Sequence, residues 1–165
     1  MSEQMIMDIK FDPSNTPRPP HGHPFFIRKG VEAILPEIKE WAGPGCGSNE
    51  DLTSDLTEAL NNVSEEDGYE LAKYLEKEGW ETDRNLLDIL DDLYGYIDDA
   101  HLEAVALWCK TADLRYPDIG SRVKVGDVVG IVTGLNEEYG TCVVDRIGYK
   151  NKGLYVFNVE NVEVL

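Results

Sequence analysis

The fold is decided by residues 83–110, which read DRNLLDILDDLYGYIDDAHLEAVALWCK. Apolar residues recur there every three or four positions, which is the spacing of one face of an α-helix. In the first part of the segment this apolar stripe consists of Leu86, Leu87, Leu90, Leu93 and Ile97. Aspartates occupy many of the positions between them, so the segment predicts amphipathic helices with one buried face and one strongly acidic face.

Cap residues predict where these helices begin. Thr82 or Asp83 can accept hydrogen bonds from the unpaired backbone N–H groups at the start of one helix. Asp98 and Asp99 can do the same for a second helix, which ends near Lys110. The second helix is expected to direct three apolar residues inwards: Leu102, Val105 and Trp108.

Three further helical segments precede this stretch. Residues 29–41 carry an apolar stripe, and Pro36 within it predicts a kink or a break into two turns. Residues 51–62 place a leucine at every fourth position, which again predicts a helix. Residues 64–79 form the third segment, with Ser64 as the expected N-cap. The short connections between these helices predict antiparallel packing in a small bundle.

After Tyr116 and Pro117 the apolar period changes from 3.6 to 2, which is the period of a β-strand. Five short alternating segments follow, separated by glycine and asparagine turns: Arg122–Val125, Val128–Val132, Thr141–Val144, Leu154–Phe157 and Val162–Leu165. Five such strands in under fifty residues predict a small closed β-barrel. The fold class expected is therefore α+β, an acidic antiparallel helical bundle followed by a small five-stranded β-barrel.

Three segments of this region carry a resemblance to a known family: Ile119–Val125, Gly130–Gly134 and Asn158–Leu165. A strand of alternating valines followed by a glycine-led strand resembles the opening of KOW- and Tudor-like small barrels. The last segment is similar to their closing strand, which often follows one short helical turn. The resemblance covers about the last 48 residues. It implies a small barrel that binds RNA, ribosomal or polymerase partners, or modified peptides.

Three domains are predicted from these patterns. Residues 1–24 contain most of the prolines and form an extended N-terminal arm. Residues 25–112 form the acidic helical domain, and residues 117–165 form the barrel. The N-terminus has no basic region followed by an apolar run, and no stretch is apolar enough to span a membrane, so a cytoplasmic protein is expected.

Charge is distributed unevenly along the chain. Its formal net charge is −17, and residues 50–103 hold 18 acidic residues against three basic ones, a net charge of −15. The segments on either side carry −1 each. Such a block repels phosphates, which argues against direct binding of DNA, RNA or an anionic membrane by the helices. It favours a basic protein as the partner.

The acidic residues recur at helical spacing. Pairs of like charge lie four residues apart, such as Asp51 with Asp55, Glu66 with Glu70 and Asp88 with Asp92. Each pair destabilises a helix by about 0.2–0.5 kcal/mol, and a basic partner would relieve that repulsion. Carboxylates one turn apart are also separated by about 5–6 Å, the same order as neighbouring phosphates. The predicted partner-binding residues are Asp51, Asp55, Glu58, Glu66, Glu70, Asp88, Asp91 and Asp92.

Catalytic and metal-binding patterns are weak. No glycine in the acidic block has the oxygen-bearing residues that an EF-hand calcium loop requires before it. The His21-Gly22-His23 run lacks the second ligand pair of a structural zinc site, and Cys46 lies in a glycine-rich loop with no activating residue beside it in the sequence. We therefore predict no catalytic residues, no metal and no cofactor.

Two functions remain open from the sequence. The first is a non-enzymatic inhibitor that covers a basic, nucleic-acid-binding surface of another protein. In charge and size alone, the chain is similar to phage-type inhibitors such as anti-CRISPR proteins and to immunity proteins against nuclease toxins. The alternative is a barrel module that binds RNA or a peptide, with the helices as scaffold. Its residues would be Tyr139, Arg146, Tyr149 and Lys150.

Overall fold

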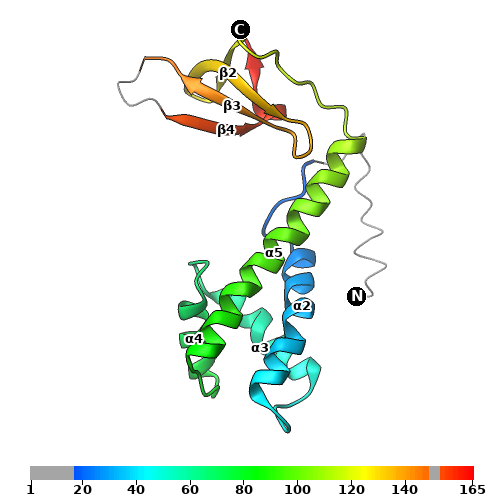
Figure 1. Ribbon diagram of the computed structural model, residues 1–165, viewed down its shortest axis with the longest axis vertical. Coiled ribbons are helices and arrows are strands. Elements are labelled where there is room, and N and C mark those ends of the chain that lie inside the picture. The colour runs from blue at the N-terminus through cyan, green and yellow to red at the C-terminus, as the bar shows by residue number, and fades with distance from the viewer. Residues whose placement is uncertain (1–16, 149–152) are drawn as a thin grey trace. The chain divides into compact units, whose positions relative to one another are not determined.

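The computed structural model describes residues 17–148 and 153–165. Within these ranges the chain forms four α-helices and one five-stranded antiparallel sheet, which confirms the α+β class (Figure 1). Contacts divide the described residues into two compact units. The helical unit comprises residues 20–101, and the sheet unit comprises residues 17–19, 102–148 and 153–165. The domain boundaries drawn from the sequence stay predictions.

Helix α2 spans Pro24–Ala42. It begins there because the ring Nδ1 of His23 accepts a hydrogen bond from the backbone N–H of Phe25 at 3.1 Å. Pro24 also suits the first turn, because proline has no backbone N–H that would need a partner there. Pro36 lies inside the helix without ending it, so the break considered from the sequence does not occur. Ile34 and Ile38 on either side of Pro36 are fully buried. The burial of these two side chains offsets the roughly 3 kcal/mol that an internal proline costs.

Helices α3 (Asn49–Asn62) and α4 (Gly68–Lys77) follow. The hydroxyl of Ser48 caps α3 by accepting a hydrogen bond from the N–H of Asp51. The predicted start of α4 at Ser64 is wrong, because Asp67 is its N-cap and accepts a hydrogen bond from the N–H of Tyr69 at 3.0 Å. The acidic residues just before Asp67 therefore lie outside the helix.

Helix α5 spans Arg84–Thr111 as one continuous helix, so the prediction of two helices divided at residues 98–99 is wrong. Its start agrees with the sequence, since Asp83 accepts a hydrogen bond from the N–H of Leu86 at 2.9 Å. The apolar stripe that contains Ile97 continues at helical spacing to Val105 and Trp108, which are both buried. Because this apolar face continues past the two aspartates, nothing ends the helix at that point.

The core of the helical unit is made by one apolar stripe from each helix. Its buried side chains are Phe26, Val31, Ile34, Ile38, Leu52, Leu56, Ala59, Leu71, Ala72, Leu75, Leu86, Leu90, Leu93 and Ile97. Gly30 lets α2 approach α5 closely, because a Cβ atom at this position would overlap the side chain of Ile97. The acidic residues between the stripes are left on the outside of the packed helices.

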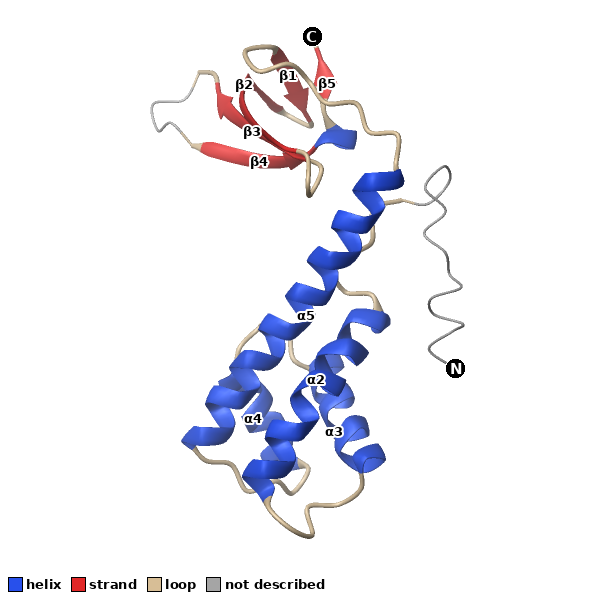
Figure 2. Ribbon diagram, turned by 45° about the vertical axis from the view of Figure 1, so that its right-hand side comes forward, coloured by secondary structure: helices blue, strands red, loops and turns tan. Residues whose placement is uncertain are grey.

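The sheet contains β1 (Arg122–Val125), β2 (Val128–Asn136), β3 (Thr141–Arg146), β4 (Leu154–Asn158) and β5 (Glu163–Val164). Its order is β4-β3-β2-β1-β5, with antiparallel neighbours (Figure 2). The predicted closed barrel is wrong, because β4 and β5 are the two edges and no ladder joins them among the described residues. β5 contains only two residues, so it offers too little backbone to close the sheet.

One face of the sheet is buried. Its core is formed by Val123, Val132, Cys142, Val144 and Val159. Leu114 and Tyr116, from the segment between α5 and β1, pack against this core together with Leu135, Phe157 and Val162. Val159 belongs to a short 3₁₀ turn, Val159–Asn161, that precedes β5.

Arg18 ties the described end of the proline-rich arm to the sheet unit. Its guanidinium donates hydrogen bonds to the backbone oxygens of Tyr139 at 2.6 Å and Gly140 at 2.8 Å. It also donates two bonds to the carboxylate of Glu160, at 2.6 and 2.9 Å. The guanidinium carbon lies 4.9 Å from the centre of a Trp108 ring. This part of the arm is therefore held by specific contacts, and Pro19 beside it is buried.

Candidate functional site

The predicted acidic residues of α3 lie along one side of that helix, since Asp51, Asp55 and Glu58 are spaced by four and three residues. Two of them bind groups of the chain itself. A carboxylate oxygen of Asp55 accepts a hydrogen bond from the indole N–H of Trp80 at 3.0 Å. Glu58 accepts one from the hydroxyl of Tyr74 at 3.2 Å. Both carboxylates thus help to hold α4 and the residues after it.

The two predicted residues near α4 do not form the pair that the sequence indicated. Glu66 precedes the helix, so it does not share a helical face with Glu70. A carboxylate oxygen of Glu66 lies 3.9 Å from Nδ1 of His21, whose Nε2 also contacts Asp98 at 2.5 Å. Glu70 forms an ion pair with Lys73 at 3.4 Å. The repulsion expected between Glu66 and Glu70 is therefore replaced by contacts with cationic or polar partners.

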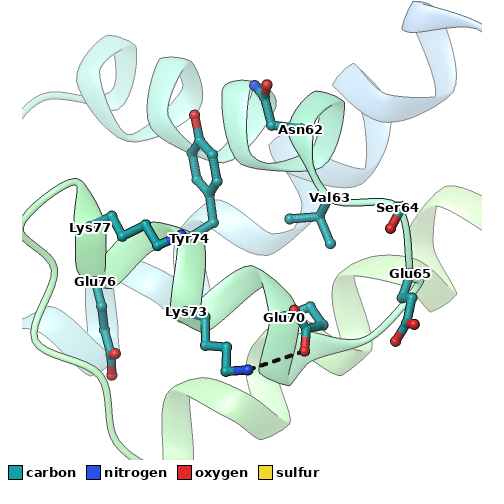
Figure 3. A pocket seen from close by; sticks show the side chains of 9 residues that line it. All are labelled: Asn62, Val63, Ser64, Glu65, Glu70, Lys73, Tyr74, Glu76 and Lys77. Atoms are coloured by element: carbon teal, nitrogen blue, oxygen red, sulfur yellow. Dashed lines mark hydrogen bonds and ion pairs between the residues drawn. The ribbon is translucent and has the colours of Figure 1, made fainter.

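A pocket of about 720 Å³ lies where the end of α3 meets α4, and Glu70 is part of its lining (Figure 3). Lys73 and Lys77 line the same pocket, together with Glu76 and Tyr74. Figure 3 shows the Lys73 side chain extending to Glu70. Because both signs of charge are present, this pocket has no strong preference for a cation or an anion.

The three predicted aspartates of α5 lie on different sides of the helix. Asp91 is on a flank, where its Oδ1 accepts a hydrogen bond from the N–H of Gly68 at 2.8 Å and so holds the start of α4. Asp88 and Asp92 lie opposite the buried stripe, in line with Asp99. We call these three residues the outer stripe. All three are exposed and have no hydrogen-bond or ion-pair partner within residues 17–148 and 153–165.

Two tyrosines of α5 have raised pKa values, and nearby carboxylates contribute to both shifts. The pKa of Tyr96 is raised, chiefly by the charge of Glu37, with burial, a hydrogen bond to Glu37 and the charges of Asp92 and Asp99 adding to it. The pKa of Tyr94 is raised to about 12, first by burial and then by nearby carboxylates, among them Asp91. A negative potential disfavours a second negative charge, so both shifts have the sign expected for an acidic surface.

A second pocket, of about 580 Å³, lies between the end of α2, the start of α3 and the residues before α5. Trp41 and Trp80 line it as a nearly parallel pair, with ring centres 6.3 Å apart and an interplanar angle of 12°. Their indole N–H groups bind carboxylates: Trp41 donates to Asp83 at 2.9 Å and Trp80 to Asp55 at 3.0 Å. We call this the tryptophan pocket; its charged lining residues are Asp51, Asp55, Glu81 and Asp83.

Sequence reasoning missed the pairing of the two tryptophans. The helical spacing of residues 29–41 predicts that Trp41 lies on the apolar stripe, and no sequence pattern marks Trp80. Both nevertheless lie beside glycine-containing loops, Trp41 two residues before Gly43 and Trp80 directly after Gly79. A large aromatic residue at the end of a helix is a signal for a half-buried site, because the loop there leaves one side uncovered.

The alternative site on the sheet unit is not assembled by the described residues. Tyr139 lies in the turn before β3, and Arg146 is the last residue of that strand. The six residues of β3 separate them by roughly 20 Å. Tyr149 and Lys150 lie outside the described residues.

Two thiols among the described residues of the sheet unit have raised pKa values. Burial raises the pKa of the Cys109 thiol, although the nearby Arg18 charge acts to lower it, and burial raises the pKa of Cys142. Both thiols are therefore less reactive than a free cysteine. Within residues 17–148 and 153–165, no group of three or more His, Cys, Asp or Glu side chains is placed to hold a metal ion. Cys46 is half-buried and lines the tryptophan pocket.

Comparisons with known proteins found no similar protein. No protein-family model matches the chain, and neither the curated proteins nor the solved structures contain a match. In the part of the chain that the structure describes, no helix combines the length and the apolar character needed to cross a membrane.

Proposed function

We propose that this chain is a non-enzymatic protein-binding protein whose helical unit covers a basic surface of another protein. The partner surface is one that binds nucleic acid, and its occupation inhibits the partner. The observation that carries this proposal is the outer stripe of Asp88, Asp92 and Asp99. These carboxylates are exposed, lie on one line of α5 and have no compensating group among the described residues.

The charge of the whole helical unit supports the same function. Residues 20–101 contain 20 acidic residues against six basic ones, a net charge of −14. Two of the basic residues, Arg28 and Lys29, already contact Glu32 at 3.2 and 3.8 Å. A surface with this excess of negative charge attracts a basic protein and accelerates the encounter of the two proteins. The same surface repels nucleic acid.

The spacing of the outer stripe suits a phosphate-binding surface. Asp88 and Asp92 are one turn apart, about 5–6 Å between their Cβ atoms, and repel each other by roughly 0.2–0.5 kcal/mol. The stripe from Asp88 to Asp99 extends about 16 Å along the helix. Arginine and lysine side chains that normally bind a row of phosphates would meet a row of carboxylates instead, and binding would relieve the repulsion.

Affinity capture tests this proposal. The outer stripe is neutralised by Asp88→Asn, Asp92→Asn and Asp99→Asn, and the immobilised proteins are exposed to lysate of cells that naturally contain the chain. We expect the wild type to retain a nucleic-acid-binding protein, which double-stranded DNA or RNA displaces. The neutralised variant is expected to lose it, because the cationic residues of the partner lose their acceptors.

The matched control replaces three exposed aspartates of the sheet unit: Asp113→Asn, Asp118→Asn and Asp127→Asn. It makes the same change in net charge and should keep the partner. Retention by both variants, or a captured protein that nucleic acid does not displace, would contradict the proposal.

A second candidate function rests on the edge strand β4. It pairs only with β3 among the described residues, and Leu154 and Val156 are each 66% exposed. An uncovered, apolar edge can accept an extended peptide as an additional strand. In the same capture assay, Leu154→Ser with Val156→Thr would then remove the partner, while the outer-stripe variant would keep it.

A further inference from the structure

The tryptophan pocket has features that the packing of the helices does not require. Trp41 and Trp80 are only partly buried, and their rings are stacked against each other at the end of the bundle. Every charged side chain that lines the pocket is acidic, and no lysine or arginine lines it among the described residues. Its volume of about 580 Å³ falls within the range of ligand-binding pockets, about 300–1,000 Å³.

Hydrogen bonds inside the pocket orient two of its four carboxylates, Asp55 and Asp83. Asp83 accepts the indole N–H of Trp41 and the backbone N–H of Leu86 on one oxygen, and Asp55 accepts the indole N–H of Trp80 on one oxygen. The other oxygen of each carboxylate has no hydrogen-bond partner within residues 17–148 and 153–165. The pocket therefore presents oriented acceptors beside aromatic faces, and both attract a cation.

Arginine fits this combination better than lysine. A guanidinium group is planar, so it stacks on an indole ring while its N–H groups bind a carboxylate in the same plane. An ammonium group is a compact and more strongly hydrated charge, which gains less from the flat face of a ring. We propose that the tryptophan pocket binds an arginine side chain of a basic protein partner.

Two other pockets of the helical unit lack this combination. The pocket in Figure 3 contains Lys73 and Lys77, which would repel a cation. A third pocket, on the outer side of α3, is lined by polar residues and two glutamates without an aromatic ring. Only the tryptophan pocket, among these three, joins aromatic faces to an uncompensated set of carboxylates.

The inference deepens the proposed function, because it rests on a basic partner for the helical unit and names a residue type by which that partner is held. It also extends the contact region, since the tryptophan pocket involves α2, α3 and the residues before α5, whereas the outer stripe lies on α5 alone. Asp51 and Asp55, which the sequence predicted as partner-binding residues, belong to this pocket.

The direct test is a titration followed by two-dimensional ¹H–¹⁵N NMR, without the natural partner. The chain has three tryptophans, so its indole N–H groups give three signals. The probes are two end-blocked pentapeptides, Gly-Gly-Arg-Gly-Gly and Gly-Gly-Lys-Gly-Gly. The arginine peptide is expected to shift the signals of Trp41 and Trp80 saturably and to bind at least about fivefold more tightly than the lysine peptide. Trp108, in the sheet unit, is the internal reference.

Two double variants separate pocket binding from general charge attraction. Asp51→Asn with Glu81→Gln removes two charges from the pocket, at exposed side chains that accept no hydrogen bond among the described residues. Asp88→Asn with Asp92→Asn removes two charges from the outer stripe. We expect the first to weaken binding of the arginine peptide by at least about fivefold and the second by less than about twofold. Glu81→Gln alone is the fallback should the first pair disturb the fold.

The inference is overturned if neither tryptophan signal shifts, if the two peptides bind equally, or if both double variants weaken binding equally. The outcomes also separate the two proposals. If the peptides do not bind and the outer-stripe variant loses the partner, arginine binding by the tryptophan pocket is excluded and the proposed function is supported. If the arginine peptide binds and the outer-stripe variant still captures the partner, arginine binding by the pocket is supported and the outer stripe is excluded as the contact surface.

Discussion

Replacing Arg18 with alanine should destabilise the sheet unit by about 2–4 kcal/mol. The side chain is only 14% exposed, and its loss removes the donors of two short hydrogen bonds to the backbone oxygens of Tyr139 and Gly140. Hydrogen bonds from a charged donor contribute about 1.5–3 kcal/mol each, and water can satisfy part of what is lost here. The partly exposed ion pair with Glu160 adds at most about 1 kcal/mol.

Urea denaturation followed by the fluorescence of Trp108 measures this loss. A background with Trp41→Phe and Trp80→Phe leaves Trp108 as the only tryptophan, so the signal reports on the sheet unit. Glu160→Ala should cost about 1 kcal/mol or less, because the two backbone hydrogen bonds of Arg18 remain. Arg115→Ala is the matched control, an exposed arginine in the same unit, and should change stability by less than about 0.5 kcal/mol.

This reasoning is refuted if Arg18→Ala lowers the free energy of unfolding no more than the other two substitutions do. If Arg18→Ala costs no more than Glu160→Ala, or no more than Arg115→Ala, the backbone hydrogen bonds contribute nothing measurable. The proline-rich segment would then not be held by Arg18, and the contacts that join it to the β2–β3 turn would have no energetic role.

Three further predictions concern charge and packing. Burial acts to raise the pKa of Glu160, but hydrogen bonds and the charge of Arg18 outweigh it and lower the pKa below the usual 4.5. The contribution of Glu160 to stability is therefore complete above pH 4.5 and is lost as pH falls through the lowered pKa. Acid titration of the Glu160→Gln variant should lack that loss. Gly30→Ala should cost about 1–3 kcal/mol in thermal or urea unfolding, because the added methyl overlaps Ile97; an unchanged midpoint would show that α2 and α5 can separate. Asp88→Asn should stabilise the helical unit by about 0.2–0.5 kcal/mol at low salt by removing repulsion from Asp92, and a gain that persists at high salt would exclude this cause.

Much of the local structure was readable from the sequence because it depends on residues three or four positions apart. The leucine spacing in residues 83–110 predicted a buried helical face, and Asp83 was correctly named among the possible caps. The change to a period of two after Pro117 predicted five strands, and five strands are present. These features follow from backbone geometry and the separation of apolar from polar side chains, which act within a few residues.

The individual roles of the acidic residues were not readable. Asp91 and Asp92 are neighbours in the sequence, yet Asp91 binds the start of α4 while Asp92 belongs to the outer stripe. Composition treats the two alike, since both are exposed aspartates in an acidic block. Which of them is used inside the protein depends on which flank of α5 meets α4, and that is a property of the packed helices.

The sequence by itself determined the α+β class, the apolar faces of the helices and the concentration of negative charge in one part of the chain. Only the tertiary structure decided that the sheet stays open, that α5 is continuous and that Trp41 and Trp80 form one pocket with four carboxylates. The physical reason is the range of the interactions. Caps and periodicity act over one or two helical turns, whereas strand closure and the pairing of residues 39 positions apart depend on how whole elements pack.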